Sequence, residues 1–197
     1  MGITLSYKNQ DGLKMNTLTI FGIIIGAALL FVIILYNSLI LLRNQVKNAF
    51  AQIDVQLKRR NDLIPNLVET VKGYMKHEKS VLENVTKARS ALLAAQSIDK
   101  KAKASNMLSE TLKSLFAVSE NYPQLKANEN FLQLQEEITG TENKISYARQ
   151  HYNDIVMAFN TKIETFPNSV FVNILNFRQE QLFQTAEEER KNVKVKF

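Results

Sequence analysis

The sequence predicts an all-α protein in which an N-terminal transmembrane helix continues into an antiparallel long-helix bundle. Three observations support this. No charged residue occurs between Lys14 and Arg43 in the chain of 197 residues. Apolar residues recur at heptad spacing in the rest of the chain. Only 6 Gly and 3 Pro are present, too few for an all-β chain, which turns about every 8–12 residues. We therefore divide the chain into a short N-terminal segment (1–17), a transmembrane helix (18–42) and a helical bundle domain (43–197).

The composition leaves little material for catalysis. The absence of cysteine excludes disulfides, a cysteine nucleophile and thiolate metal sites. The two histidines, His77 and His151, are too few for a histidine-rich metal centre. No glycine-rich phosphate loop or nucleophile elbow occurs. We therefore expect no enzymatic activity, no catalytic residue, no cofactor and no metal.

The uncharged stretch is long enough to cross a membrane. Its apolar centre runs from Ile20 to Leu35, and about 20 such residues span a bilayer. A cleaved signal peptide has an apolar region of only about 7–15 residues, followed by small residues. Here the stretch leads into Tyr36 with no such site, which favours a retained anchor with the lipid bilayer as its partner. Met15 is a possible alternative start.

The positive charge is concentrated just after this stretch. Residues 43–90 carry ten basic and five acidic side chains, whereas residues 91–197 carry thirteen of each. That placement suits anionic lipid headgroups, and we expect no nucleic-acid binding. Lysine and arginine are also more numerous after the span than before it, which predicts an N-terminus outside and a C-terminal domain in the cytoplasm.

The next segment predicts one long helix that ends near Ser97. Two rows of residues keep a heptad phase, with Arg60 and Glu78 as the polar exceptions. The rows are Val46, Ile53, Arg60, Leu67, Tyr74, Val81, Ala88 and Ala95, and Phe50, Leu57, Ile64, Val71, Glu78, Val85 and Leu92. Pro65 is expected to kink the helix, and Gly73 is a second candidate break. The retained phase favours a kink over a reversal of the chain.

Three further helices are expected. Asp99 is read as the cap of the second, which Pro123 closes. The third extends over about 124–165, with a seam of Phe131, Ile138, Ile145, Tyr152 and Phe159. The last is short and lies within 170–177. The tail 193–197 alternates like a strand.

Arg60 is the residue that best fits a buried ion pair. A charge on a core seam is costly unless it is paired, and Glu142 or Glu78 could be the partner. Arg59 and Arg60 could instead bind a phosphate-bearing lipid or ligand, or the Arg60 side chain could extend its charged end to solvent.

The leading functional interpretation is a membrane-tethered interaction or scaffold module with a membrane-protein partner. Its docking face would be polar residues away from the seam of the first helix, unless these only solvate the helix. They are Asp54, Arg59, Asp62, Asn66 and Glu69, with Gln52 and Gln56 beside them. The alternative is a ligand sensor or a hydrolase-like site near Arg60, Asn66, Glu142 and Asn143. A third reading is a homo-oligomer paired through Phe171, Leu175 and Phe177, although the favoured reading is that the same chain covers these residues.

Several motifs resemble the LemA family. The run from Arg43 to Glu78 reads RNQVKNAFAQIDVQLKRRNDLIPNLVETVKGYMKHE. The runs SENYPQLKAN (119–128) and TENKISYAR (141–149), the latter followed by Tyr152-Asn153, are also similar to the family. So are Phe166-Pro167 and the closing Val-x-Val-x-Phe. The resemblance covers about residues 36–197.

The resemblance implies a bacterial single-pass protein of the cell (inner) membrane. It implies a short N-terminus outside and a helical bundle in the cytoplasm, in agreement with the charge bias. It implies no established enzymatic activity. It also points to assembly with other membrane proteins.

Overall fold

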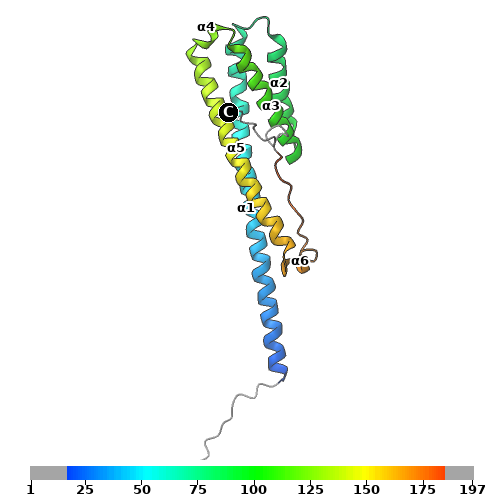
Figure 1. Ribbon diagram of the computed structural model, residues 1–197. Coiled ribbons are helices and arrows are strands. Elements are labelled where there is room, and N and C mark those ends of the chain that lie inside the picture. The colour runs from blue at the N-terminus through cyan, green and yellow to red at the C-terminus, as the bar shows by residue number, and fades with distance from the viewer. Residues whose placement is uncertain (1–16, 185–197) are drawn as a thin grey trace, which may run out of the picture.

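The computed structural model describes residues 17–184, in which every regular element is a helix and no strand occurs. Figure 1 shows α1 as a rod along the whole molecule, with the other helices beside its C-terminal part. The helices are α1 (Thr17–Lys72), α2 (Lys79–Ala94), α3 (Ile98–Ser119), α4 (Pro123–Lys126), α5 (Glu129–Glu164) and α6 (Asn168–Phe171). The predicted all-α fold is confirmed.

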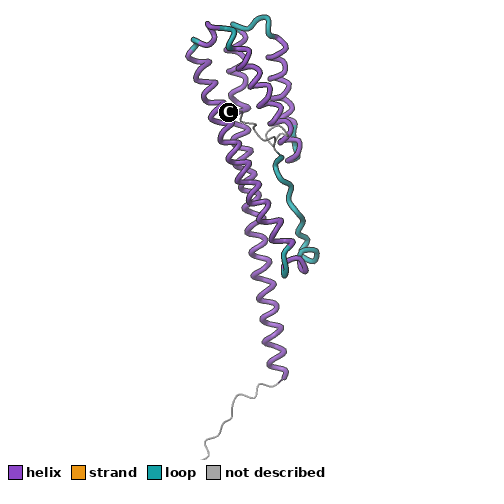
Figure 2. The backbone as a smooth tube through the Cα atoms, viewed as in Figure 1, coloured by secondary structure: helices purple, strands orange, loops and turns teal. Residues whose placement is uncertain are grey.

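Four of these helices form an antiparallel bundle. α1 packs chiefly against α5, and α2 packs chiefly against α3. The α1–α2 connection and α4 lie at the end of the bundle far from the N-terminus of α1 (Figure 1). α6 lies at the opposite end, and an extended segment runs back from it beside the bundle (Figure 2).

The heptad rows predict the core well. In α1 both rows are buried at Val46, Ile53, Arg60, Leu67, Leu57, Ile64 and Val71. The predicted seam of α5 is buried at all five positions from Phe131 to Phe159. Because α1 and α5 each bury one apolar stripe, the two long helices pack along their shared length.

The prediction of one helix up to Ser97 is wrong. α1 ends at Lys72, and the chain reverses at 73–78 before α2 begins at Lys79. The heptad phase persists only because Val71 and Val85 happen to be separated by two whole heptads. A reversal whose length matches the repeat therefore has the same apolar pattern as a continuous helix.

Pro65, by contrast, does not interrupt α1. Proline has no N–H, so the carbonyl of Asn61, one turn earlier, loses its normal helical donor. The Arg89 side chain on α2 donates from Nε to this carbonyl at 3.2 Å. Because Asn61 is buried, water cannot readily donate to its carbonyl, and Arg89 satisfies this acceptor instead.

Replacing Arg89 with alanine should lower the free energy of unfolding by about 1–2 kcal/mol, because it leaves a buried carbonyl without its donor. The second substitution Pro65→Ala should recover most of that loss, because alanine donates its own backbone N–H to Asn61. Urea denaturation followed by circular dichroism measures both. Equal losses in the single and double variants would contradict this role for Arg89.

Other helix ends differ from the sequence expectation in detail. Ser97, not Asp99, caps α3, since its side chain accepts from the Lys100 N–H at 3.3 Å. The expected third helix is interrupted after Lys126, and α5 begins at Glu129 under an Asn128 cap. The last helix is a single turn, α6. The tail 193–197 lies outside the described residues.

The N-terminal part of α1 is the one helix in the described chain that is long and apolar enough to cross a membrane. Its side chains are almost all exposed from Thr17 to Ile34, and Leu35 is its first buried residue. The last part of the expected span, from Leu35 onward, therefore also packs against the protein. The expected span and the bundle therefore overlap along α1.

Candidate functional site

Arg60 lies at the centre of the bundle with none of its surface exposed. Its guanidinium donates to the Glu142 carboxylate on α5, to Ser109 Oγ at 2.9 Å and to Ser105 Oγ at 2.7 Å on α3. Ser109 Oγ in turn donates to Glu142 at 2.8 Å. Burial lowers the pKa of Arg60, and the charge of Glu142 opposes that shift. Of the two carboxylates considered, the structure places Glu142 beside Arg60.

A second buried arginine adjoins this cluster. Arg149 donates to the same Ser105 Oγ at 2.6 Å and to Asn106 at 3.0 Å, and its guanidinium lies 4.9 Å from the Phe183 ring centroid. Sequence reasoning missed it. Arg149 follows Glu142 by seven residues, so the two share a face of α5; this spacing was the available signal.

The cluster joins α1, α3 and α5 through hydrogen bonds between their side chains. Both terminal nitrogens of Arg60 are occupied by protein groups. Asn66 and Asn143, the other residues of the predicted ligand or hydrolase site, are exposed on the bundle surface. The structure therefore does not favour a site for a small ligand around Arg60.

The extended segment after α6 is held by asparagine side chains of α5. Asn153 donates to the Phe183 carbonyl at 3.1 Å and accepts from its N–H at 2.8 Å. Asn160 makes the same pair of bonds to Glu180, at 2.9 Å each. Asn153 and Asn160 are seven helical residues apart, and Glu180 and Phe183 are three extended residues apart. Both separations are about 10 Å, so each asparagine meets one residue of the extended segment. The backbone of 180–183 is thus fixed antiparallel to α5.

Tyr152 adds a third tie by donating from its hydroxyl to the Gln181 carbonyl at 2.8 Å. Burial, followed by the charge of Glu180, raises the pKa of Tyr152 to about 12. The phenol in an unfolded chain has a pKa of about 10. Between these values the unfolded chain loses the proton while the folded chain keeps it, so rising pH favours unfolding.

We expect the contribution of Tyr152 to stability to be complete below pH 10 and lost as the pH rises through about 12. The difference in unfolding free energy between the wild type and Tyr152→Phe should therefore shrink across this interval. Urea denaturation at a series of pH values measures it. A difference that stays constant up to pH 12 would contradict the raised pKa.

The residues of the predicted docking face differ in exposure and in their contacts. Arg59, Asp62, Asn66 and Glu69 form one exposed stripe along α1. Asp54 lines one pocket together with Asp62, and its carboxylate accepts from Lys101 of α3 at 2.7 and 2.8 Å. Asp54 is thus a contact between helices, and the other four residues are left as a possible docking stripe.

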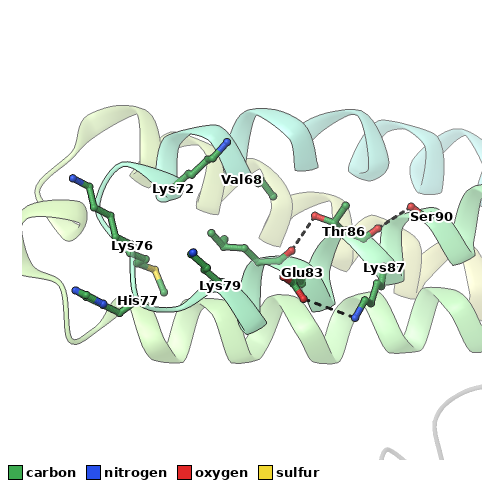
Figure 3. A pocket seen from close by; sticks show the side chains of 11 residues that line it. Val68, Lys72, Lys76, His77, Lys79, Glu83, Thr86, Lys87 and Ser90 are labelled. Carbon is green, nitrogen blue, oxygen red and sulfur yellow. Dashed lines mark hydrogen bonds and ion pairs between the residues drawn. The ribbon is translucent and has the colours of Figure 1, made fainter.

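A further cavity was not predicted from the sequence. It is a groove of about 1080 Å³ between the end of α1 and the start of α2. Figure 3 shows its lining side chains, which come from both helices and the turn between them. Val68 and Leu82, which are half-buried, supply apolar surface, and Met75 is fully buried at the groove. The remaining lining residues are Lys72, Lys76, His77, Lys79, Glu83, Thr86, Lys87 and Ser90.

The rim of this groove is strongly basic. Four lysines line it against one carboxylate, Glu83. Lys87 lies 4.0 Å from Glu83, and Lys72 lies 3.9 Å from Glu69 on α1. Lys76 and Lys79 form no ion pair within residues 17–184. The signal in the sequence is the cluster of lysines around Gly73, which by sequence alone does not stand out from the basic excess of residues 43–90.

Comparison with known proteins places the chain in a family. Residues 49–197 match the LemA family. A relative named Protein LemA, from Metamycoplasma hominis, is 30% identical over 159 residues, which cover 80% of this chain and 72% of that protein. The family match begins at Ala49, within α1, and includes helices α2 to α6. It therefore contains both Arg60 and the basic groove. The chain belongs to the LemA family.

Proposed function

We propose that this protein is a membrane-anchored interaction module whose basic groove binds an acidic amphipathic helix of a partner protein. The groove carries the proposal, because it combines an apolar floor with an excess of lysines at its rim. Such a surface complements a helix with leucine-like anchors on one side and carboxylates beside them.

The position of the groove favours a protein partner over the bilayer. Val68 lies 34 residues after Ile34, the last residue of the exposed apolar stretch. At a rise of about 1.5 Å per residue, the groove is about 50 Å from that stretch along α1. Membrane headgroups attract basic residues only within about 10 Å of the surface. A partner segment can reach the groove, whereas a lipid of the same membrane cannot.

The anchor completes the proposal. The exposed N-terminal part of α1 crosses the membrane once, and the basic residues after it orient the bundle toward the cytoplasm of a bacterial cell. The partner is then a second membrane protein or a cytoplasmic protein recruited to the membrane. The bundle serves as a rigid spacer that presents the groove, and its role is binding rather than catalysis.

A peptide-binding measurement tests the groove. The probe is a fluorescent synthetic amphipathic helix with leucine on one face and glutamate on the other, added to the full-length protein in lipid nanodiscs. The double variant Lys76→Glu/Lys79→Glu should weaken binding by about tenfold or more, because it places like charges along the contact. Fluorescence anisotropy gives the affinity.

The matched control is Lys100→Glu/Lys113→Glu, which makes the same charge change at exposed positions of α3. It should leave the affinity nearly unchanged. A peptide carrying lysine in place of glutamate should not bind. Equal losses in both double variants would show a general effect of net charge and contradict the groove. If Asp62→Lys/Glu69→Lys alone abolished partner binding, the exposed stripe of α1 would be the docking face instead.

A further inference from the structure

The end of the bundle nearest the anchor carries an exposed apolar patch. Phe166, Val170 and Ile174 expose 83%, 57% and 79% of their surface, respectively. They lie within nine residues around α6, and we call them the foot. Neighbouring apolar residues here, such as Phe171 and Leu175, pack against the core, and Phe177 is buried. The same chain thus covers one side of this turn and leaves the foot uncovered.

Contacts with α1 fix the height of the foot along the stalk. The Lys162 ammonium at the end of α5 bonds to the Ser38 hydroxyl. The Phe177 ring lies 6.0 Å from that of Tyr36. The foot is therefore level with the residues that immediately follow the exposed apolar stretch of α1, as Figure 1 shows for α6.

That height coincides with the surface expected for a bilayer. The exposed stretch from Leu18 to Ile34 is about 25 Å long at 1.5 Å per residue, and the hydrocarbon core is about 30 Å thick. Even with Leu18 at one boundary, the hydrocarbon would extend to about Ser38 on the other side. The foot then lies at the boundary between acyl chains and headgroups, where exposed phenylalanine and aliphatic side chains are stabilised.

We infer that the foot inserts into the interfacial layer of the lipid bilayer, so that the bundle rests on the membrane at two places, α1 and the α6 turn. This inference depends on the membrane anchor proposed above. Two attachments fix the tilt and rotation of the bundle, which a single helix does not. The groove, at the end of the bundle far from the membrane, is then held in a fixed position relative to the bilayer.

The sequence permits a direct optical test because it contains no tryptophan. The substitution Phe166→Trp places a single fluorophore in the foot of the full-length protein. The protein is reconstituted into vesicles of phosphatidylcholine and phosphatidylglycerol, with or without bromine on the acyl chains. Bromine quenches only a nearby indole. We expect blue-shifted emission from the Phe166→Trp protein and loss of most of that emission in brominated vesicles.

Two controls separate the possible failures. Ile24→Trp reports on the anchor and should be strongly quenched. Tyr147→Trp, at a position with 74% exposure on α5, should emit as an indole in water and escape quenching. Quenching at Ile24→Trp without quenching at Phe166→Trp would overturn the foot and leave the anchor standing. Loss of quenching at both would overturn both.

The alternative is that the foot packs against a second copy of the chain instead of lipid. In that case the Phe166→Trp emission would be blue-shifted but unaffected by brominated lipid, and the shift would fade as the protein is diluted in the membrane. That result would overturn the lipid assignment. Far-UV circular dichroism of each variant confirms that the helices are retained.

Discussion

Replacing Glu142 with glutamine should lower the free energy of unfolding by about 3 kcal/mol, because it leaves the buried Arg60 charge without its counter-ion. Arg60 has no exposed surface, and both of its terminal nitrogens face protein groups. The Glu142 side chain exposes 35% of its surface, so water can reach its position, and the expected loss lies at the lower end for a broken buried pair. Urea denaturation of the purified protein, followed by circular dichroism, gives the change.

Two further variants distinguish charge burial from a general effect on α5. Glu136→Gln makes the same change at an exposed position of the helix and should alter stability by no more than about 0.5 kcal/mol. The pair Arg60→Met/Glu142→Leu removes both charges and should be more stable than Glu142→Gln alone, because no uncompensated charge remains. A double variant less stable than the single one would show that the unpaired Arg60 charge is not the cause of the loss in Glu142→Gln.

Removing residues 1–34 should move the protein from the membrane fraction to the soluble fraction with its bundle intact, whereas removing residues 1–42 should also destabilise the bundle. The exposed apolar stretch ends at Ile34, but Leu35 and Leu39 are buried and the Tyr36 ring contacts Phe177. Loss of each buried leucine costs about 2–5 kcal/mol. The longer deletion therefore removes part of the core as well as the anchor.

Membrane fractionation and thermal unfolding of the two deletions measure this boundary. Full-length protein sedimented with membranes after a high-salt wash is the reference. Equal stability of both deletions would show that residues 35–42 do not contribute to the folded body. Retention of the shorter deletion in the membrane fraction would instead show that the anchor is not the main attachment.

Apolar periodicity predicted the parts of this fold that depend on burial along one helix. The seams of α1 and α5 appear as heptad rows because each buries a single stripe against the other. The reversal at Gly73 was not predictable from phase, because Val71 and Val85 remain in register across it. Spacing along a helix carries no direction, so a hairpin and a kink have the same pattern.

The site features depended on contacts between distant segments. Arg60 could be recognised as a buried charge because it interrupts an apolar row, but a single sequence could not decide between Glu142 and Glu78. Asn153 and Asn160 resemble ordinary polar surface residues, and their role emerges only when the backbone of 180–183 returns beside α5. The basic groove likewise requires the α1–α2 reversal, which brings Lys72 and Lys87 to one surface.

The most direct test of the proposed function is zero-length carbodiimide crosslinking of the tagged full-length protein in its native membrane, followed by mass spectrometry of the joined peptides. This reagent links lysine to a carboxylate only when the two are in contact. The proposal predicts crosslinks from the groove lysines Lys76 and Lys79 to acidic residues of one stoichiometric partner, lost in Lys76→Glu/Lys79→Glu but retained in Lys100→Glu/Lys113→Glu. Recovery of the protein without a partner, or of a partner joined only through other lysines, would contradict it.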